Sequence, residues 1–317
     1  MFQLYKKRNF NDYINDTFQF FKIHGKHFFT LYFTINGAFL LIATVLIYFI
    51  CKVYFEFIFS SLSGGIAAQQ NNSLGNLFAN NSSTVFVLAI LGLLFLVLIS
   101  IIQFAFPLLY LDLLEKNNGP NFTTKDVIVS LKQKAFKLIK FAVGLLFIFT
   151  PLMTIIFGLN VLLCFIIIGF PLFLITIPAV MSWMHLSFTY YIVGDERFFS
   201  ALSLAYSDIR QQFWPIVFST MLMYMIIQVV NTIFTMIPYV IGILFVMTNV
   251  ENQNDTQKTF NLITIIMTAV VVVSLMANYI LNNLLLINEG IIYYSRKDVN
   301  ENISSSNSID LIGSESE

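Results

Sequence analysis

The chain has 317 residues, of which 57% are hydrophobic and only 11% are charged, and its mean hydropathy is +0.79. Ordinary soluble domains carry roughly 25% charged residues, so this composition excludes that class. The formal net charge is zero, so the charge balance does not suggest a nucleic-acid partner, and we expect none.

The apolar residues lie in long uncharged blocks. Asp, Glu, Lys and Arg are all missing from residues 27–51, 57–111, 141–194, 211–250 and 259–288. A bilayer core of roughly 30 Å needs about 20 apolar residues per helix, so the longer blocks can each supply more than one span. Soluble helices would need polar outer faces, which these blocks lack. The sequence predicts an all-α membrane protein with six transmembrane helices, at about 28–58, 84–113, 140–168, 171–195, 213–248 and 259–294.

A short amphipathic stretch precedes the first span, at about 10–23. Phe10, Tyr13, Ile14, Thr17, Phe18 and Phe21 recur at helical spacing on one side, and Asn11, Asp12, Asn15, Asp16, Gln19 and Lys22 fall on the other. We interpret this stretch as a helix that lies flat on the membrane surface. Gly25 would permit the bend, and Phe28 would start the span.

Two later stretches have the same arrangement, at about 123–137 and 197–210. In the earlier one, Thr123 and Asp126 make a variant capping box before an apolar side that faces away from the lysines. In the later one, one face is formed by Phe198, Leu202, Ala205, Tyr206 and Ile209. The pattern predicts a unit of one interfacial helix and one transmembrane hairpin that occurs three times.

The middle hairpin has two candidate turns, Gly158-Leu159-Asn160 and Gly169-Phe170-Pro171. We prefer the second, because it divides the block more evenly and matches the span lengths of the other units. Residues 1–298 would then form one polytopic membrane domain. The polar residues 299–317 are expected to be a disordered cytoplasmic tail.

The basic residues set the expected orientation, because loops rich in Lys and Arg stay in the cytoplasm. Residues 1–27, 114–140, 194–212 and 295–317 hold 15 of the 17 Lys and Arg residues. Both termini and the three amphipathic stretches are therefore expected on the cytoplasmic side of a bacterial inner membrane. The polar loop at 60–84 is expected on the other side.

Five polar residues fall within the expected spans at a similar depth. Each lies about 8 to 12 residues from a cytoplasmic helix end, and they are Asn36, Gln103, His185, Asn282 and Asn283. Polar groups at that depth must face protein or water. They form either a polar cavity for a headgroup or small solute, or interhelical hydrogen bonds that fix the packing, and packing is the more usual role.

Lysines on the amphipathic stretches are candidates for contact with lipid headgroups, since each can add about 1 kcal/mol near an anionic leaflet. The candidates are Lys22, Lys26, Lys132, Lys134, Lys137 and Lys140. They could serve only as anchors, or they could form a surface that senses lipid or docks a partner.

Charged residues at the span boundaries are expected to have ordinary roles. Asp112, Glu115 and Glu289 lie near cytoplasmic ends of spans and should be solvated. Lys52 and Glu56 stand four residues apart at an outer end, which is typical of an interfacial ion pair, with an entry gate for charged solutes as the alternative.

Catalytic patterns are weak in this sequence. Of the three histidines, His24 and His27 are expected at the surface, so no metal site built on several histidines can form. Ser182 and His185 share a helix, but no nucleophile elbow or acidic partner accompanies them. We expect no enzyme activity, no metal and no cofactor. Two cysteines, Cys51 and Cys164, could pair in a disulfide, although packing is the more usual role.

Residues 183–214, WMHLSFTYYIVGDERFFSALSLAYSDIRQQFW, resemble a pattern in bacterial membrane proteins. In that group a span ends before an acidic residue, an Ala-Leu…Ser helix follows, and a basic residue precedes Phe-Trp. The matching residues here are Glu196, Ala201, Leu202, Ser207, Arg210, Phe213 and Trp214. The group includes the membrane domain of some glycerophosphodiester phosphodiesterases and six-span proteins of the Bacteroidota type. The resemblance implies a six-helix inner-membrane fold with cytosolic interfacial helices, and no catalytic residues.

Two kinds of function remain open from the sequence. One is a non-catalytic accessory or scaffold protein that engages membrane lipids or a membrane-protein partner. The other is a carrier for a lipid or small amphipathic solute, which would need a polar cavity near the middle of the membrane.

Overall fold

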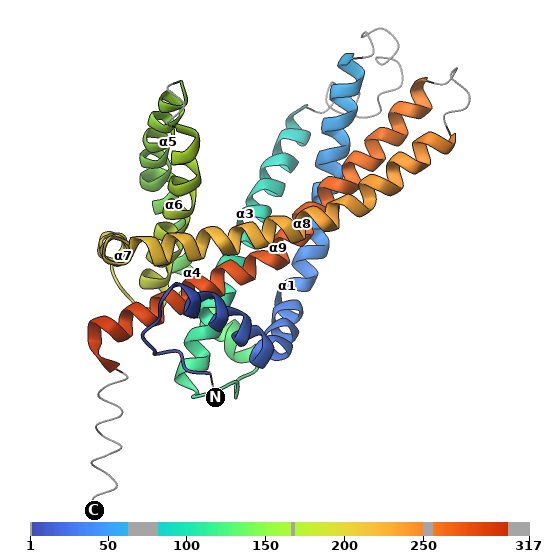
Figure 1. The fold of residues 1–317 in the computed structure, drawn as a ribbon. Coiled ribbons are helices and arrows are strands. Elements are labelled where there is room, and N and C mark those ends of the chain that lie inside the picture. Colours follow the sequence, from blue (N-terminus) through green and yellow to red (C-terminus); the bar gives the residue numbers. More distant parts are fainter. Residues whose placement is uncertain (1, 63–81, 166–168, 250–255, 304–317) are drawn as a thin grey trace, which may run out of the picture. The chain divides into compact units, whose positions relative to one another are not determined.

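The computed structural model describes residues 2–62, 82–165, 169–249 and 256–303, and the regular structure in those ranges is entirely helical. A π-helical turn, η1 (Leu145–Phe149), joins α4 to α5. The α-helices are α1 (Phe10–Leu62), α3 (Ser82–Lys116), α4 (Thr124–Gly144), α5 (Thr150–Cys164), α6 (Gly169–Ile192), α7 (Phe198–Gln211), α8 (Phe213–Asn249) and α9 (Thr256–Glu301), as Figure 1 shows.

Six helical segments are long and apolar enough to cross a membrane. They cover Phe10–Phe55, Phe86–Lys116, Thr124–Cys164, Gly169–Ile192, Phe213–Leu244 and Leu262–Glu301. The predicted class, an all-α chain with six such helices, is confirmed. The threefold repeat and the side of each terminus stay predictions.

Only the third amphipathic stretch forms a helix of its own. α7 is bounded by Asp195 in a left-handed conformation (φ 57°) and by Gln212 (φ −130°, ψ 52°). The first stretch instead continues into its span within α1, because no proline or left-handed residue interrupts the helix near Gly25. The second continues through η1 into α5, so separate interfacial helices at 10–23 and 123–137 do not occur in this structure.

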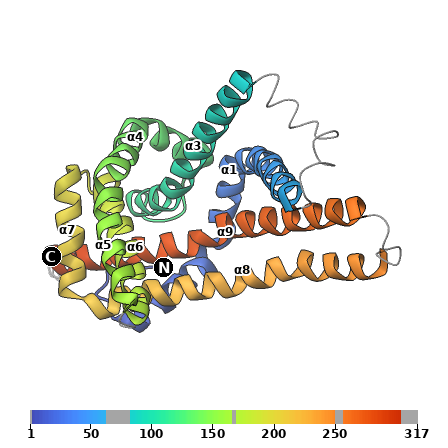
Figure 2. The same cartoon turned by 90° about the horizontal axis from the view of Figure 1, so that it is seen from above.

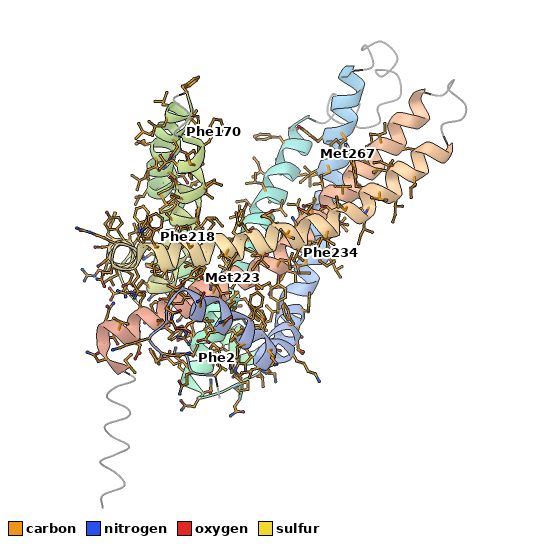
Figure 3. The ribbon with its side chains drawn as sticks, in the orientation of Figure 1. Phe2, Phe170, Phe218, Met223, Phe234 and Met267 are labelled. Carbon is orange, nitrogen blue, oxygen red and sulfur yellow. The ribbon has the colours of Figure 1, made fainter. Side chains whose placement is uncertain are left out.

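α6 begins at Gly169, so the break between α5 and α6 lies beside the second of the two predicted turns, whose residues Gly169, Phe170 and Pro171 belong to α6 itself. α5 stays helical through Gly158 and ends at Cys164. A Cβ atom at Gly169 would lie 2.3 Å from the backbone nitrogen of Cys164, so glycine allows the two helices to approach closely here. The α5–α6 hairpin is green in Figure 1, and Phe170 lies at its tip in Figure 3 with its ring largely exposed.

The chain divides into two compact units. Unit 1 comprises residues 1–35, 101–226 and 282–317, and unit 2 comprises residues 36–100 and 227–281. Unit 1 has an aromatic core in which Phe20, Phe28, Tyr32, Phe106 and Tyr110 make edge-to-face contacts. The core of unit 2 contains Ala43, Ile47 and Ile99. Within unit 1, α7 lies across the axis of α6, as Figures 1 and 2 together show.

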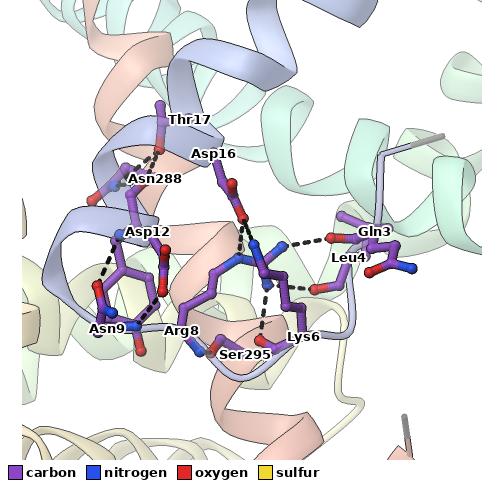
Figure 4. A network of polar contacts seen from close by, with 11 residues as sticks. Gln3, Leu4, Lys6, Arg8, Asn9, Asp12, Asp16, Thr17, Asn288 and Ser295 are labelled. Atoms are coloured by element: carbon purple, nitrogen blue, oxygen red, sulfur yellow. Dashed lines mark hydrogen bonds and ion pairs between the residues drawn. The ribbon is translucent and has the colours of Figure 1, made fainter.

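The first residues of the chain fold around the buried side chain of Arg8. Its Nε donates to Asp16 Oδ2 at 2.7 Å, and its other nitrogens donate to the backbone oxygens of Gln3, Leu4 and Lys6 (Figure 4). The backbone N–H of Arg8 donates to Ser295 Oγ on α9 at 3.1 Å. The N-terminal segment is therefore held both to the start of α1 and to the end of α9.

The end of α9, the Lys52–Glu56 pair and the two cysteines bear on three further predictions. α9 continues to Glu301, so residues 299–301, predicted to start the disordered tail, are helical, and residues 304–317 lie outside the described residues. The predicted Lys52–Glu56 pair also lies outside them, because the Glu56 side chain is not described. Cys51 and Cys164 are both free thiols.

Candidate functional site

Two neighbouring residues on α8 and two on α9 place polar side chains in the interior of unit 1. They are Ser219 and Thr220 on α8 and Asn288 and Glu289 on α9, and all four are fully buried. Ser219 Oγ donates to Asn288 Oδ1 at 3.2 Å. The Asn288 amide in turn donates to Thr17 Oγ1 at 3.0 Å and to a backbone oxygen of α1. The first turns of α1 are thus fixed to α9 by buried hydrogen bonds.

The other two of these four residues, Thr220 and Glu289, form a cluster around the buried carboxyl group of Glu289. Thr220 Oγ1 lies 2.6 Å and Ser182 Oγ 3.0 Å from Glu289 Oε1, so α6, α8 and α9 meet at this group. The two hydroxyl oxygens, from Ser182 and Thr220, are 2.5 Å apart. Glu289 Oε2 is buried and has no hydrogen-bond partner among the described residues. The acidic neighbour that Ser182 lacks in the sequence pattern is therefore present in space, and it touches the serine directly.

The prediction that Asp112 and Glu289 are solvated is wrong. Glu289 is 0% exposed and Asp112 is 2% exposed. Both α3 and α9 continue past the expected ends of their spans, so these residues lie within helix packing. Asp112 Oδ2 accepts from Lys116 Nζ at 2.8 Å and from Lys134 Nζ at 3.3 Å. Asp112 is therefore a paired buried charge, whereas the hydrogen-bond partners of Glu289 among the described residues are two hydroxyl groups.

A second buried ionic contact joins α7 to α9. Arg296 Nε lies 3.1 Å from Asp208 Oδ1, and each side chain is 2% exposed. Tyr190 from α6 donates to the other carboxylate oxygen of Asp208 at 2.5 Å. Sequence reasoning missed this pair because Arg296 looks like a terminal basic residue. The available signal was the spacing of Ala201, Ala205 and Asp208, which places Asp208 on the narrow buried face of α7.

Four of the five polar residues that the sequence places at a similar depth in the membrane are buried. Asn36, Gln103, His185 and Asn283 are at most 3% exposed, whereas Asn282 is half-buried. Asn36 belongs to unit 2 and the others to unit 1. His185 packs against the ring of Phe104, next to Gln103, with 5.7 Å between ring centroids. His185 Nδ1 has no hydrogen-bond partner among the described residues.

The six candidate headgroup lysines fall into two sets. Lys22, Lys26, Lys132 and Lys140 are exposed. Lys134 instead donates to the backbone oxygen of Ile192 at 2.8 Å as well as to Asp112, and Lys137 lies 2.5 Å from Asp195 Oδ1. The hydrogen bond from Lys137 holds the pKa of Asp195 below its usual range. Lys134 and Lys137 therefore connect helices.

The prediction that His24 and His27 lie at the surface is wrong. His24 is buried against the rings of Phe2 and Phe20. His27 is half-buried, and its ring nitrogens lie 2.9 Å from Tyr110 Oη and 3.1 Å from the backbone oxygen of Phe122. The N-terminal segment and the α3–α4 connection cover this part of α1, which sequence periodicity cannot indicate.

A small open cavity of about 150 Å³ lies beside the Arg8 network. Its lining residues are Phe2, Gln3, Lys6, Asp16 and Gln19, of which Phe2 is labelled in Figure 3. Lys6 Nζ lies 3.4 Å from Asp16 Oδ2, so the cavity's charged groups already interact with one another.

Comparison with known proteins gives no match to a family model, a curated protein or a solved structure. The chemistry of the described side chains therefore carries the functional argument.

Proposed function

We propose that this chain is a non-catalytic accessory or scaffold protein of a bacterial inner membrane that engages anionic lipid through the exposed faces of α4 and α7. The observation that carries the proposal is the division of each helix into a packed face and an exposed face. A helix of this kind at the edge of a bundle is typical of a membrane interface.

On α4 the exposed face combines basic and apolar side chains. Val127, Leu138 and Phe141 are buried, whereas Lys132, Phe136 and Lys140 are exposed. Phe136 is 67% exposed, and Lys140 Nζ lies 4.4 Å from the centre of its ring. An aromatic ring beside two lysines suits the headgroup region, where the ring meets acyl chains and the ammonium groups meet phosphate.

On α7 the buried face differs from the predicted one by about one position. Ala201, Ala205 and Ile209 are buried, whereas Phe199 and Tyr206 are exposed. Small residues let α7 pack closely, so its larger rings are left on the outside. Tyr206 lies one helical turn before the exposed Arg210, and this exposed ring and charge support contact with the membrane surface.

Lipid binding can be tested by native mass spectrometry of the full chain with phosphatidylglycerol and with phosphatidylcholine. The double variant Lys132→Gln/Lys140→Gln should bind roughly 5- to 30-fold less phosphatidylglycerol, since each lysine adds about 1 kcal/mol. The matched variant Lys132→Arg/Lys140→Arg keeps the charge and should bind normally. Equal phosphatidylglycerol binding by the Gln variant and the wild type would contradict the proposal.

A carrier for a lipid or small amphipathic solute is the second candidate. It is supported by the buried polar residues predicted at a similar membrane depth. Among them, His185 Nδ1 has no hydrogen-bond partner among the described residues. Replacing His185 by Phe and Asn283 by Leu tests whether these residues bind a solute or only fix the helix packing. Loss of a co-purified lipid or solute with unchanged stability favours the carrier, whereas lost stability with unchanged retention favours packing alone.

The membrane and the orientation follow from the sequence arguments and stay part of the proposal. The positive-inside pattern places both termini in the cytoplasm. It is supported by the grouping of the start of α1, the end of α3, the start of α8 and the end of α9 in unit 1. The resemblance to the six-span group suggests the same topology and transfers no phosphodiesterase activity.

A further inference from the structure

Glu289 is a buried ionisable group that has no cationic partner among the described residues. It is fully buried between α6, α8 and α9, and its described contacts are two hydroxyl groups. The segments of these helices at 169–192, 213–244 and 262–295 contain no Lys or Arg. The next basic residue on α9 is Arg296, whose guanidinium group is held by Asp208 and Gln211. An ionised Glu289 would be an unpaired buried charge, which folded proteins rarely tolerate.

The hydrogens available at this cluster lead to the same conclusion. Four short contacts join its oxygen atoms: Ser182–Thr220 at 2.5 Å, Thr220–Glu289 at 2.6 Å, Ser182–Glu289 at 3.0 Å, and Thr220 to the backbone oxygen of Ile216 at 3.1 Å. The two hydroxyl groups supply two hydrogens. A protonated carboxyl adds a third, so that three of the four contacts can hold a hydrogen instead of two.

We propose that Glu289 is a proton-binding site at the contact of α6, α8 and α9, which holds its proton while the helices are packed and releases it to water only when the contact opens. This inference goes beyond the proposed function, because engagement of lipid requires no ionisable group in the protein interior. Proton release is therefore linked to a change in packing among the three helices.

Other titratable groups lie on the helices that surround Glu289. The nearest on α6 is His185, one turn from Ser182, and on α9 it is Tyr293, one turn beyond Glu289. α3 packs against Gly290 through Leu111, and its nearest acid, Asp112, is paired with two lysines. Further titratable groups on adjoining elements include Tyr13 and Asp16 on α1, Tyr110 on α3, Tyr190 on α6 and Tyr224 on α8.

The proton can be detected by infrared spectroscopy of the full chain in nanodiscs, with ¹³C-labelled glutamate to identify the group. At pH 7 the wild type should show the carbonyl band of a protonated, labelled carboxyl group, and Glu289→Gln should lack it. Thr220→Val should keep the band at a shifted frequency, since it removes one hydrogen-bond partner. A wild-type spectrum without such a band would overturn the proposal.

Stability provides a second readout. A group that keeps its proton when folded and loses it on unfolding makes stability fall as pH rises. The thermal midpoint of the wild type should therefore fall by roughly 5 °C between pH 6 and pH 8 through Glu289. Glu289→Gln should lack this component and stay near the wild-type midpoint at pH 6, because Gln resembles the neutral acid in shape.

Asp208→Asn is the matched control, because it changes a buried acid that has a cationic partner. It should lower the midpoint at every pH. A Glu289→Gln variant that is destabilised as much as Asp208→Asn would contradict a neutral Glu289. A midpoint that rises with sodium in the wild type but not in Glu289→Gln, at fixed pH, would replace the proton by a metal cation and overturn the proposal.

Discussion

At the scale of single residues, the buried acids of unit 1 differ in what they contact. In the part of the chain that the structure describes, Asp112 contacts two lysines, Asp208 contacts Arg296 and a tyrosine hydroxyl, and Glu289 contacts serine and threonine hydroxyls but no cation. A carboxylate beside a cation is strongly stabilised in its charged form, whereas hydroxyl donors stabilise that form less and burial without a cation opposes it. The three residues should therefore respond differently to neutral substitution.

The Asp208–Arg296 pair should be sensitive to the loss of either partner. Asp208→Asn leaves a buried guanidinium without a counter-charge, which typically costs about 3–5 kcal/mol. We expect a clear fall in the thermal midpoint, measured by intrinsic fluorescence in detergent. Lys137→Gln breaks an exposed pair and should cost about 1 kcal/mol or less. Similar losses in the two variants would show that the buried pair has no special role.

The exposed pair can be followed through the pKa of Asp195, which is lowered first by the hydrogen bond from Lys137 and also by the charges of Lys134 and Lys116. A lowered pKa in the folded protein contributes stability above the unfolded pKa, and this is lost as pH falls through the folded value. Lys137→Gln should raise the pKa of Asp195 towards about 3.9, measured by NMR titration of labelled aspartate. Lys116→Gln should raise it less, and a reversed order would contradict the assigned cause.

At the scale of helices, glycine positions separate close approach from simple helix interior. At Gly169 an added Cβ would lie 2.5 Å from the backbone oxygen of Asn160, and backbone atoms cannot move away as a flexible side chain can. At Gly158, on the same hairpin, an added Cβ would meet nothing within 4 Å. The two helices therefore depend on glycine at only one of these positions.

Gly169→Ala should destabilise the α5–α6 hairpin by about 1–3 kcal/mol, since the added methyl group forces the two backbones apart. Gly158→Ala should be neutral or stabilising by up to about 1 kcal/mol, because alanine loses less backbone freedom on folding. Thermal midpoints of the two variants in the same detergent measure the difference. If Gly158→Ala were the more damaging, the close approach at Gly169 would not determine the stability of the hairpin.

At the scale of the whole molecule, the sequence predicts the helical class and the number of apolar helices well, because uncharged blocks of membrane length leave few alternatives. The Thr123–Asp126 cap is also confirmed, with the Thr123 N–H donating to Asp126 Oδ2 at 2.7 Å. These features depend on local spacing. The partners of the buried acids Glu289 and Asp208 could not be predicted in this way, because each partner is distant in the sequence.

The predicted topology can be tested in a chain whose cysteines are removed by Cys51→Ser and Cys164→Ala. A single cysteine at Asn72 should react with an impermeant maleimide in intact cells, because the 60–84 loop is predicted to be outside. One introduced at Asn300 should react only after permeabilisation. Labelling of the Asn300 site in intact cells would show that the orientation is reversed.

The hydrogen bond between Arg8 and Ser295 has a consequence for biosynthesis. The two residues are 287 positions apart, so α9 must be synthesised before they can meet. The segment that precedes α1 therefore cannot take up its final conformation while the spans before α9 are being inserted. Its attachment to α9 follows the synthesis of all the helices from α1 to α8.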